Sequence, residues 1–136
     1  DVLIKGLKQP VFGICLGMQL MCSHSEENDT ACLGIFDEKV KLFKRETGNE
    51  KIPQIGWNNI FDLKSPLFEN VPEQSFIYLV HSYYAAIGED TIATTDYINP
   101  YSAGLHMNNF YGVQFHPEKS AAVGERILKN FLNISL

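Results

Sequence analysis

The chain has 136 residues, of which 45% are hydrophobic and 20% are charged. This length and composition suit one domain with a hydrophobic core but not two. The formal net charge is −5, and the 11 Lys and Arg residues are scattered along the chain, which argues against a nucleic-acid partner.

The sequence also argues against a membrane protein and against a disulfide or metal framework. No apolar run approaches about 18 residues, and residues 1–9 lack the features of a signal peptide, so we expect a cytoplasmic protein. The three cysteines, Cys15, Cys22 and Cys32, are odd in number and include no CxxC pair. We therefore expect no disulfides, no metal and no other cofactor.

The N-terminal part of the chain predicts a strand, a sharp turn and a helix. Residues 1–9 read as the last turns of a helix whose start is missing, so we expect a fragment of a longer protein. Residues 11–14 are a short apolar run that predicts a strand, and residues 18–21 are helix formers. Residues 24–30 are polar and predict a loop.

Strand signals dominate the rest of the chain. Residues 102–107 and 110–115 predict a hairpin, because the Asn-Asn pair between them tolerates the positive φ of a tight turn. Residues 121–132 are amphipathic and predict a closing helix. Further strands are predicted at residues 39–43, 55–61, 76–80 and 91–95. Together these elements predict an α/β domain with a mixed sheet.

One cysteine stands between two glycines, in Gly13-Ile14-Cys15-Leu16-Gly17, after a predicted strand and before a predicted helix. This is the nucleophile-elbow arrangement, in which a strained turn exposes the nucleophile. We expect a Cβ at either glycine to collide with neighbouring elements, and the helix N-terminus to lower the pKa of the thiol. The backbone N–H of Leu16 would donate to an oxyanion. A buried structural cysteine is the alternative.

A base for this thiol is predicted where the last strand ends, in Gln114-Phe115-His116-Pro117-Glu118. The carboxyl ends of strands are where α/β sites lie. In a thiol mechanism His116 would take the cysteine proton and later protonate the leaving group, while Glu118 would orient the imidazole. An HPE segment alone fits a surface loop, but with a glycine-flanked cysteine it predicts a catalytic triad.

The segments GICLGMQ and QFHPEKS, in this order, resemble the class I glutamine amidotransferases over nearly the whole chain. The segments PQIGWN and VHSYY are similar to one subfamily, the glutaminase subunits of imidazole glycerol phosphate synthases of histidine biosynthesis. The resemblance implies a three-layer, flavodoxin-like fold with a mixed sheet. It also implies hydrolysis of L-glutamine to glutamate and ammonia through a thioester on Cys15.

The resemblance further implies a glutamine pocket. Gln19 and Glu27 would hold the amino-acid end of the substrate, and the backbone of His81, Ser82 and Tyr83 would line the same pocket. A carboxylate at Glu27 suits an α-ammonium group. The alternatives are an exposed helix residue for Gln19 and a solvated loop acid for Glu27. A second catalytic base is the alternative for His81, but a lone histidine at the end of an apolar strand is more often a satisfied structural residue, so we expect it to form a wall of the pocket.

In this subfamily the ammonia passes to a cyclase partner, which is a (β/α)8 barrel and forms imidazole glycerol phosphate and an aminoimidazole carboxamide ribotide (AICAR). Trp57, Asn58 and Lys119 would face this partner in a heterodimer. Trp57 would otherwise be a core aromatic residue, and Lys119 a plain surface charge. Gln54 departs from the His that many relatives carry, which leaves a partner-side role of that position open.

The resemblance implies that residues 1–136 are the C-terminal two-thirds of a complete amidotransferase domain. The first strands of the family, and a Pro-Gly-rich loop that supplies a second oxyanion donor, would precede Asp1. Leu16 is then the only oxyanion donor expected in this chain, and loss of one donor costs about 10²–10³ in rate. We expect the fragment by itself to fold poorly or to be inactive.

Three other functions stay open: a glutaminase of another amidotransferase, a noncatalytic binding subunit, and a thiol hydrolase of the peptidase or esterase type. The GWN and HSYY segments argue against the first. The intact Cys15, His116 and Glu118 argue against the second. Gln19 and Glu27 argue against the third, because a peptidase needs no site for a free α-amino group.

Overall fold

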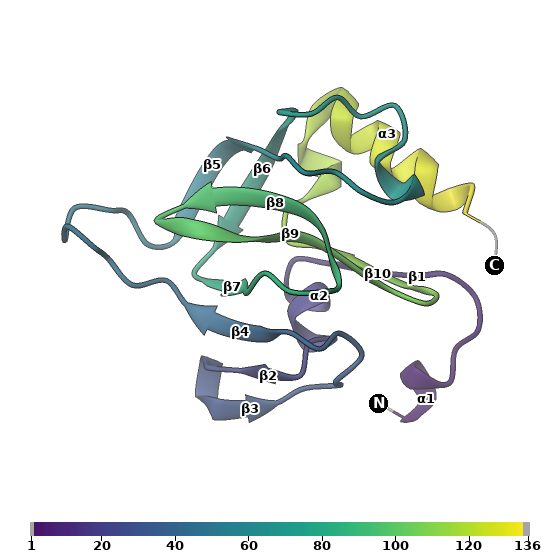
Figure 1. Cartoon of the computed structure of the whole chain (residues 1–136), viewed down its shortest axis with the longest axis horizontal. Helices are drawn as coiled ribbons and strands as arrows, with labels where there is room; N and C mark the ends of the chain where they lie inside the picture. The colour runs from purple at the N-terminus through teal and green to yellow at the C-terminus, as the bar shows by residue number, and fades with distance from the viewer. Residues whose placement is uncertain (1, 135–136) are drawn as a thin grey trace.

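The computed structural model describes residues 2–134 (Figure 1). One mixed sheet holds most of the strands, and a separate two-stranded ribbon lies beside it. In chain order the helices and strands are α1 (Val2–Lys5), β1 (Val11–Ile14), α2 (Leu16–Leu20), β2 (His24–Ser25), β3 (Thr30–Ala31), β4 (Lys39–Leu42), β5 (Gln54–Asn59), β6 (Phe76–His81), β7 (Tyr83–Ala85), β8 (Thr91–Tyr97), β9 (Asn99–Met107), β10 (Phe110–Val113) and α3 (Ala121–Leu132). Three short 3₁₀ turns are η1 (Glu27–Asp29), η2 (Pro66–Phe68) and η3 (Pro117–Lys119).

The parallel pair of β1 and β10 stands at one end of the mixed sheet. Val11 lies opposite Phe110 at the start of the pair, and Ile14 lies opposite Val113 at its end. From β10 the sheet continues antiparallel through β9 and β7 to β4, and β2 then joins β4 in parallel. β8 pairs with β9 off this path. The predicted mixed sheet is therefore confirmed.

The side chains of β10 divide the core into two clusters. Tyr111 and Val113 belong to a cluster with Ile127 of α3, whereas Phe110 belongs to a cluster with Met18 of α2. Because successive side chains of a strand point to opposite faces, α2 and α3 cover opposite faces of β10. Figure 1 shows the two helices on different sides of the β9–β10 hairpin. The predicted arrangement in three layers follows from this alternation.

The separate ribbon consists of β5 and β6, which pair antiparallel with Trp57 opposite Tyr78. Burial alternates along β6: Ile77 and Leu79 are fully buried, whereas Phe76 is exposed. The ribbon therefore packs one face on the core and leaves an apolar outer face accessible.

Most of the predicted elements are confirmed. The closing helix has the predicted bounds, and the predicted hairpin is formed by β9 and β10 with Asn108 at φ 54°. The four further predicted strands occur as β4, β5, β6 and β8, with ends displaced by one or two residues. The strand and helix around Cys15 occur as β1 and α2.

Two parts of the prediction were wrong. The predicted loop over residues 24–30 contains β2 and the first residue of β3, and both strands are two residues long and too short to show alternation. β7 was not predicted, because its three residues follow β6 almost directly and leave the ribbon to pair with β4 and β9. Within residues 2–134, no helix has the length and apolar character needed to cross a membrane.

Candidate active site

Cys15 is the single residue between β1 and α2. Its backbone N–H donates to the carbonyl oxygen of Val113 at 2.8 Å, which extends the pairing of β1 with β10 by one step. Its φ of 55° and ψ of −112° are strained for a residue with a side chain. A strained residue between a strand and a helix is the conformation expected of a nucleophile elbow.

The two glycines that flank Cys15 have different surroundings. A Cβ added to Gly13 would collide with the side chain of Met21 and lie 2.9 Å from the backbone carbonyl carbon of Gly17. A Cβ added to Gly17 would meet no atom within 4 Å. The predicted crowding is confirmed at Gly13 and wrong at Gly17, because only the backbone of Gly17 faces β1.

His116 and Glu118 lie just beyond β10, at the carboxyl end of the strand that pairs with β1. The Nδ1 atom of His116 and the Oε2 atom of Glu118 are 2.9 Å apart, so Nδ1 donates to the carboxylate and Nε2 is left to accept a proton. Partial burial raises the pKa of Glu118, but its own backbone N–H and His116 outweigh burial and hold this pKa below its usual value. Glu118 is therefore ionised at neutral pH.

Backbone contacts from β6 and α3 hold the His116 segment. The backbone N–H of His116 donates to the carbonyl oxygen of Tyr78 at 3.0 Å, and the Ser120 hydroxyl donates to the carbonyl oxygen of His116 at 2.6 Å. The same hydroxyl accepts the backbone N–H of Tyr78 at 3.0 Å. Gly124 of α3 allows a close approach, because a Cβ there would collide with the carbonyl of Pro117.

The Cys15 thiol and the His116 backbone contact the same strand, β6. The Sγ atom of Cys15 donates to the carbonyl oxygen of Val80 at 3.8 Å, and His116 bonds to Tyr78, two residues earlier. Two steps along a strand span about 7 Å, so the thiol and the His116 segment are neighbours. The thiol points at Val80 rather than at His116. The two side chains make no hydrogen bond to each other in this structure, so a catalytic hydrogen bond requires one of them to rotate, as is common before a substrate binds.

Burial raises the pKa of the Cys15 thiol above its usual value. The backbone N–H of Leu16 and the amide of Gln114 lower this pKa, and the charge of Glu118 raises it. The predicted lowering of the thiol pKa at the helix N-terminus is present, as the bond from the Leu16 N–H, but burial outweighs it. α2 is only five residues long, and the cost of desolvating the thiolate exceeds the stabilisation of the thiolate by the N-terminus of this helix. The thiol therefore needs a base.

A cavity of about 240 Å³ opens beside Cys15. It joins the elbow and the η1 turn to the β6–β7 junction, which is far from both in sequence. Its lining residues are Cys15, Leu16, Gln19, Glu27, Val80, His81, Ser82 and Tyr83. All five residues predicted for the glutamine pocket are among them, together with the predicted nucleophile and oxyanion donor. Sequence reasoning missed Val80, which shows no signal beyond its place in an apolar strand.

Glu27 and Gln19 contribute to this cavity in different ways. Glu27 is exposed, and its backbone N–H donates to the Ser25 hydroxyl at 3.1 Å. Gln19 is buried, and its Nε2 atom donates to the carbonyl oxygen of Tyr83 at 2.9 Å and to Oε1 of Gln114 at 2.8 Å. Because Gln19 is buried, it is not an ordinary exposed helix residue.

Both ring nitrogens of His81 contact polar groups inside the core. Its Nδ1 donates to the carbonyl oxygen of Tyr83 at 2.8 Å, and its Nε2 lies 2.9 Å from the Tyr101 hydroxyl and 3.0 Å from Oε1 of Gln54. Burial lowers the pKa of His81 to about 4, although the bond to Tyr83 raises it. His81 is thus a satisfied neutral histidine, as expected, and Gln54 is buried with it.

The three residues predicted to face a partner do not share one surface. Trp57 is 55% exposed on the outer face of β5, which excludes a core aromatic residue. Asn58 is the next residue on the strand and points the other way, where its amide donates to the carbonyl oxygen of Asp96 at 3.0 Å. Lys119 is exposed beside Glu118.

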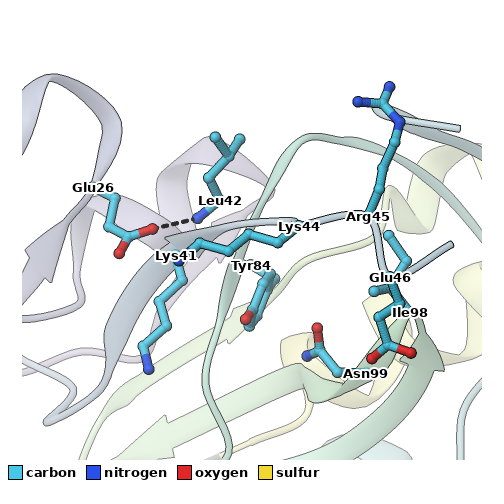
Figure 2. Close-up of a pocket in the computed structure, with 9 residues that line it drawn as sticks. All are labelled: Glu26, Lys41, Leu42, Lys44, Arg45, Glu46, Tyr84, Ile98 and Asn99. Carbon is cyan, nitrogen blue, oxygen red and sulfur yellow. Dashed lines mark hydrogen bonds between the residues drawn. The ribbon is translucent and has the colours of Figure 1, made fainter. Parts of the chain in front are cut away.

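A second cavity, of about 380 Å³, lies between β4, β7 and the start of β9 (Figure 2). Figure 2 shows the Lys41 and Arg45 side chains pointing away from each other, and the carboxylate of Glu26 bonded to the backbone N–H of Leu42. No cysteine or histidine lines it, so it does not offer the thiol and imidazole pair that the sequence predicts. Across residues 2–134, no group of three or more His, Cys, Asp and Glu side chains is placed to hold a metal ion.

The chain belongs to the class I glutamine amidotransferases, because the model of the family "Glutamine amidotransferase class-I" matches residues 2–134. Its similar relatives include proteins called imidazole glycerol phosphate synthase subunit HisH. The chain is 57% identical to the one of Bacteroides thetaiotaomicron and 58% identical to the one of Bacteroides fragilis. Each match covers 98% of this chain and 68% of the relative. The match in Shewanella sediminis is 45% identical and covers 96% of this chain and 61% of the relative.

Solved structures share the fold at low sequence identity. A putative GMP synthase protein of Thermoplasma acidophilum has a TM-score of 0.70 at 21% identity, covering 95% of this chain and 58% of that one. A glutamine amidotransferase of Thermotoga maritima has a TM-score of 0.59 at 20% identity, covering 97% of this chain and 50% of that one. The flavodoxin-like class I amidotransferase fold expected from the resemblance is confirmed.

Proposed function

We propose that this protein hydrolyses L-glutamine to glutamate and ammonia, as the glutaminase subunit of an imidazole glycerol phosphate synthase, with Cys15, His116 and Glu118 as its catalytic residues. The observation that carries the proposal is the cavity of about 240 Å³, which joins Cys15 to Glu27 and to residues 81–83. Such a cavity presents a nucleophile and an amino-acid binding site to the same small molecule.

In the proposed reaction, Nε2 of His116 takes the Cys15 thiol proton, and Sγ attacks the carboxamide carbon of glutamine. The backbone N–H of Leu16 donates to the oxyanion that forms. The C–N bond then breaks, and the proton on His116 passes to the departing nitrogen, which leaves as ammonia. Water, activated by the same imidazole, hydrolyses the thioester and restores the thiol. Glu118 holds the imidazole and stabilises its charged form.

The pocket suits the amino-acid end of glutamine. The Glu27 carboxylate pairs with the α-ammonium group, and the backbone of His81, Ser82 and Tyr83 binds the carboxylate side of the substrate. Both N–H groups of the Gln19 amide are used, toward Tyr83 and Gln114. Its Oε1 atom is therefore left to accept a hydrogen bond from the ammonium group of the substrate.

We further propose that the ammonia passes to a cyclase partner with a (β/α)8 barrel, which forms imidazole glycerol phosphate and AICAR. In support, the relatives named HisH are subunits of imidazole glycerol phosphate synthase. The exposed Trp57 on the outer face of β5 and the exposed Lys119 beside Glu118 suit a partner that docks next to the site.

The test is covalent labelling of the full-length protein together with its barrel partner. The reagent is an electrophile that mimics glutamine, and mass spectrometry maps the modified residue. We expect labelling at Cys15 that free glutamine prevents. Cys22 serves as an internal control, because it is fully buried and burial raises its pKa to about 12. Cys15→Ala should abolish ammonia release and leave partner binding intact.

Other outcomes point to other functions. No labelling, or labelling only at Cys32, would favour a noncatalytic binding subunit. Labelling of Cys15 by a peptidyl electrophile but not by the glutamine mimic would favour a thiol hydrolase. Normal labelling in a protein that copurifies with a different synthase would favour a glutaminase of another pathway.

A further inference from the structure

Gln114 is a buried polar residue beside the nucleophile, and the reaction proposed above gives it no role. It directly follows β10, and its side chain has no solvent exposure. A buried amide costs free energy unless its donors and acceptors are satisfied, so its bonding partners indicate what it does. Sequence reasoning placed Gln114 in the QFHPEKS segment but assigned it no function. The only available signal was a polar residue within an apolar run.

The bonding partners of Gln114 form a chain from the substrate cavity to the nucleophile. The Nε2 atom of Gln19 donates to the carbonyl oxygen of Tyr83 at 2.9 Å and to Oε1 of Gln114 at 2.8 Å. The Nε2 atom of Gln114 in turn donates to Sγ of Cys15 at 3.6 Å. Because Oε1 of Gln114 accepts from Gln19, its NH₂ group is directed toward the sulfur.

We propose that Gln114 is a positioning residue whose amide N–H stabilises the Cys15 thiolate, and that Gln19 fixes the direction of this donor. The proposal rests on the glutaminase function proposed above. A neutral amide can donate to the thiolate at any working pH, because it has no proton to lose. It opposes two influences that favour the neutral thiol, namely burial and the charge of Glu118. The same contact lowers the pKa of Cys15.

This role differs from simple filling of the core. A filler would matter only for stability, and an apolar residue of the same size would replace it. A donor to the thiolate would change the acid–base behaviour of Cys15 and, through it, the rate of the chemical step. Gln114 does not line the cavity, so its loss should lower kcat more than it raises the KM for glutamine.

The test measures the pH dependence of Cys15 alkylation by iodoacetamide, using the full-length protein with its barrel partner and mass spectrometry of the Cys15 peptide. Gln114→Met keeps the volume and removes the donor. We expect the apparent pKa of Cys15 to rise by about one unit, so alkylation at pH 8 becomes about tenfold slower, as for the loss of one hydrogen bond to a charged group. Glutaminase kcat should fall by a similar factor.

Two further variants keep the result interpretable. Gln114→Glu retains an acceptor for Gln19 but places a carboxylate against the sulfur, so the Cys15 pKa should rise further. This variant also tests the proposal if Gln114→Met does not fold. Asn130→Leu removes another buried amide, which donates to the carbonyl oxygens of Leu67 and Glu69, and should leave the alkylation profile unchanged.

The proposal is overturned if both Gln114 variants fold and alkylate Cys15 with the wild-type pH profile. It is also overturned if Asn130→Leu moves the profile as far as Gln114→Met does, because the effect would then be one of general stability. Alkylation does not require glutamine turnover. Failure of the glutaminase assignment would appear as absent ammonia release in the wild-type protein, whereas failure of the Gln114 role would appear in the alkylation profile.

Discussion

His81 shows how burial decides the chemistry of a residue. A histidine at the end of an apolar strand, near a cysteine, has the chemical type of a general base. In the folded chain it donates to Tyr83, contacts Tyr101 and Gln54, and burial lowers its pKa to about 4. The neutral ring stays in the core while residue His81 lines the cavity, and the half-buried His116 is left to provide the base.

The buried His81 should make the stability of the protein depend on pH. Its pKa is about 4 when folded, against about 6.5 when unfolded, so below pH 6.5 the unfolded state binds the proton more readily. We expect its contribution to the free energy of unfolding to fall by about 3 kcal/mol between pH 6.5 and 4 and then to level off. Urea unfolding of the full-length protein across this range would measure the slope. In His81→Gln the fall should be smaller by this amount, and an identical slope would contradict the role of His81.

At the scale of elements, the close approach of β1 and α2 sets the geometry of the elbow. Gly13 allows the backbone of Gly17 to lie against β1, and Cys15 between them takes strained dihedral angles. The carbonyl of Val113 then pairs with the backbone of Cys15. The position of the nucleophile is therefore a consequence of how closely one strand and one helix pack.

The two glycines provide a matched pair of variants for this packing. In Gly13→Ala the new methyl group lies against the backbone of Gly17, so α2 must move. We therefore expect the free energy of unfolding to fall by about 1–3 kcal/mol and the glutaminase activity to be reduced. In Gly17→Ala the methyl group meets open space on a helix, and we expect unchanged or higher stability, by up to about 1 kcal/mol. Chemical denaturation and ammonia release measure both effects. Equal losses in the two variants would show that packing of α2 on β1 does not position the elbow.

At the scale of the whole molecule, the apolar outer face of the β5–β6 ribbon lies next to the site. Ile55, Trp57 and Phe76 are each more than half exposed. On the same ribbon, Tyr78 and Val80 bond to the His116 backbone and the Cys15 thiol. A partner that covers this face would therefore contact the strand that supports both the nucleophile and the base.

Trp57 should be important for binding the cyclase partner. Aromatic residues in the centre of an interface often contribute about 2 kcal/mol or more, so we expect Trp57→Ala to weaken partner binding by about tenfold or more. Ile87→Ala is a suitable control, because Ile87 is 50% exposed but lies outside the ribbon. Titration calorimetry with the purified cyclase partner proposed above would measure both affinities. Equal affinities for the two variants would mean that the partner docks on another face.

Local sequence was enough to predict the parts of this protein that depend on neighbours along the chain. The hairpin followed from two asparagines, the closing helix from its amphipathic period, and the candidate triad from a glycine-flanked cysteine and an HPE segment. These signals are local because turn geometry and helix periodicity act over a few residues. The family that these segments resemble is the one whose model matches residues 2–134.

Features that depend on distant segments became visible only in the folded chain. Burial raises the Cys15 pKa, and this burial depends on how distant segments pack around the thiol. Gln114 bonds to Cys15 across 99 positions of the chain. β7 exists because it pairs with β4 and β9, and Trp57 is exposed because the ribbon turns its other face to the core. Burial and cross-chain hydrogen bonds arise only when the chain is folded, so no local pattern could indicate them.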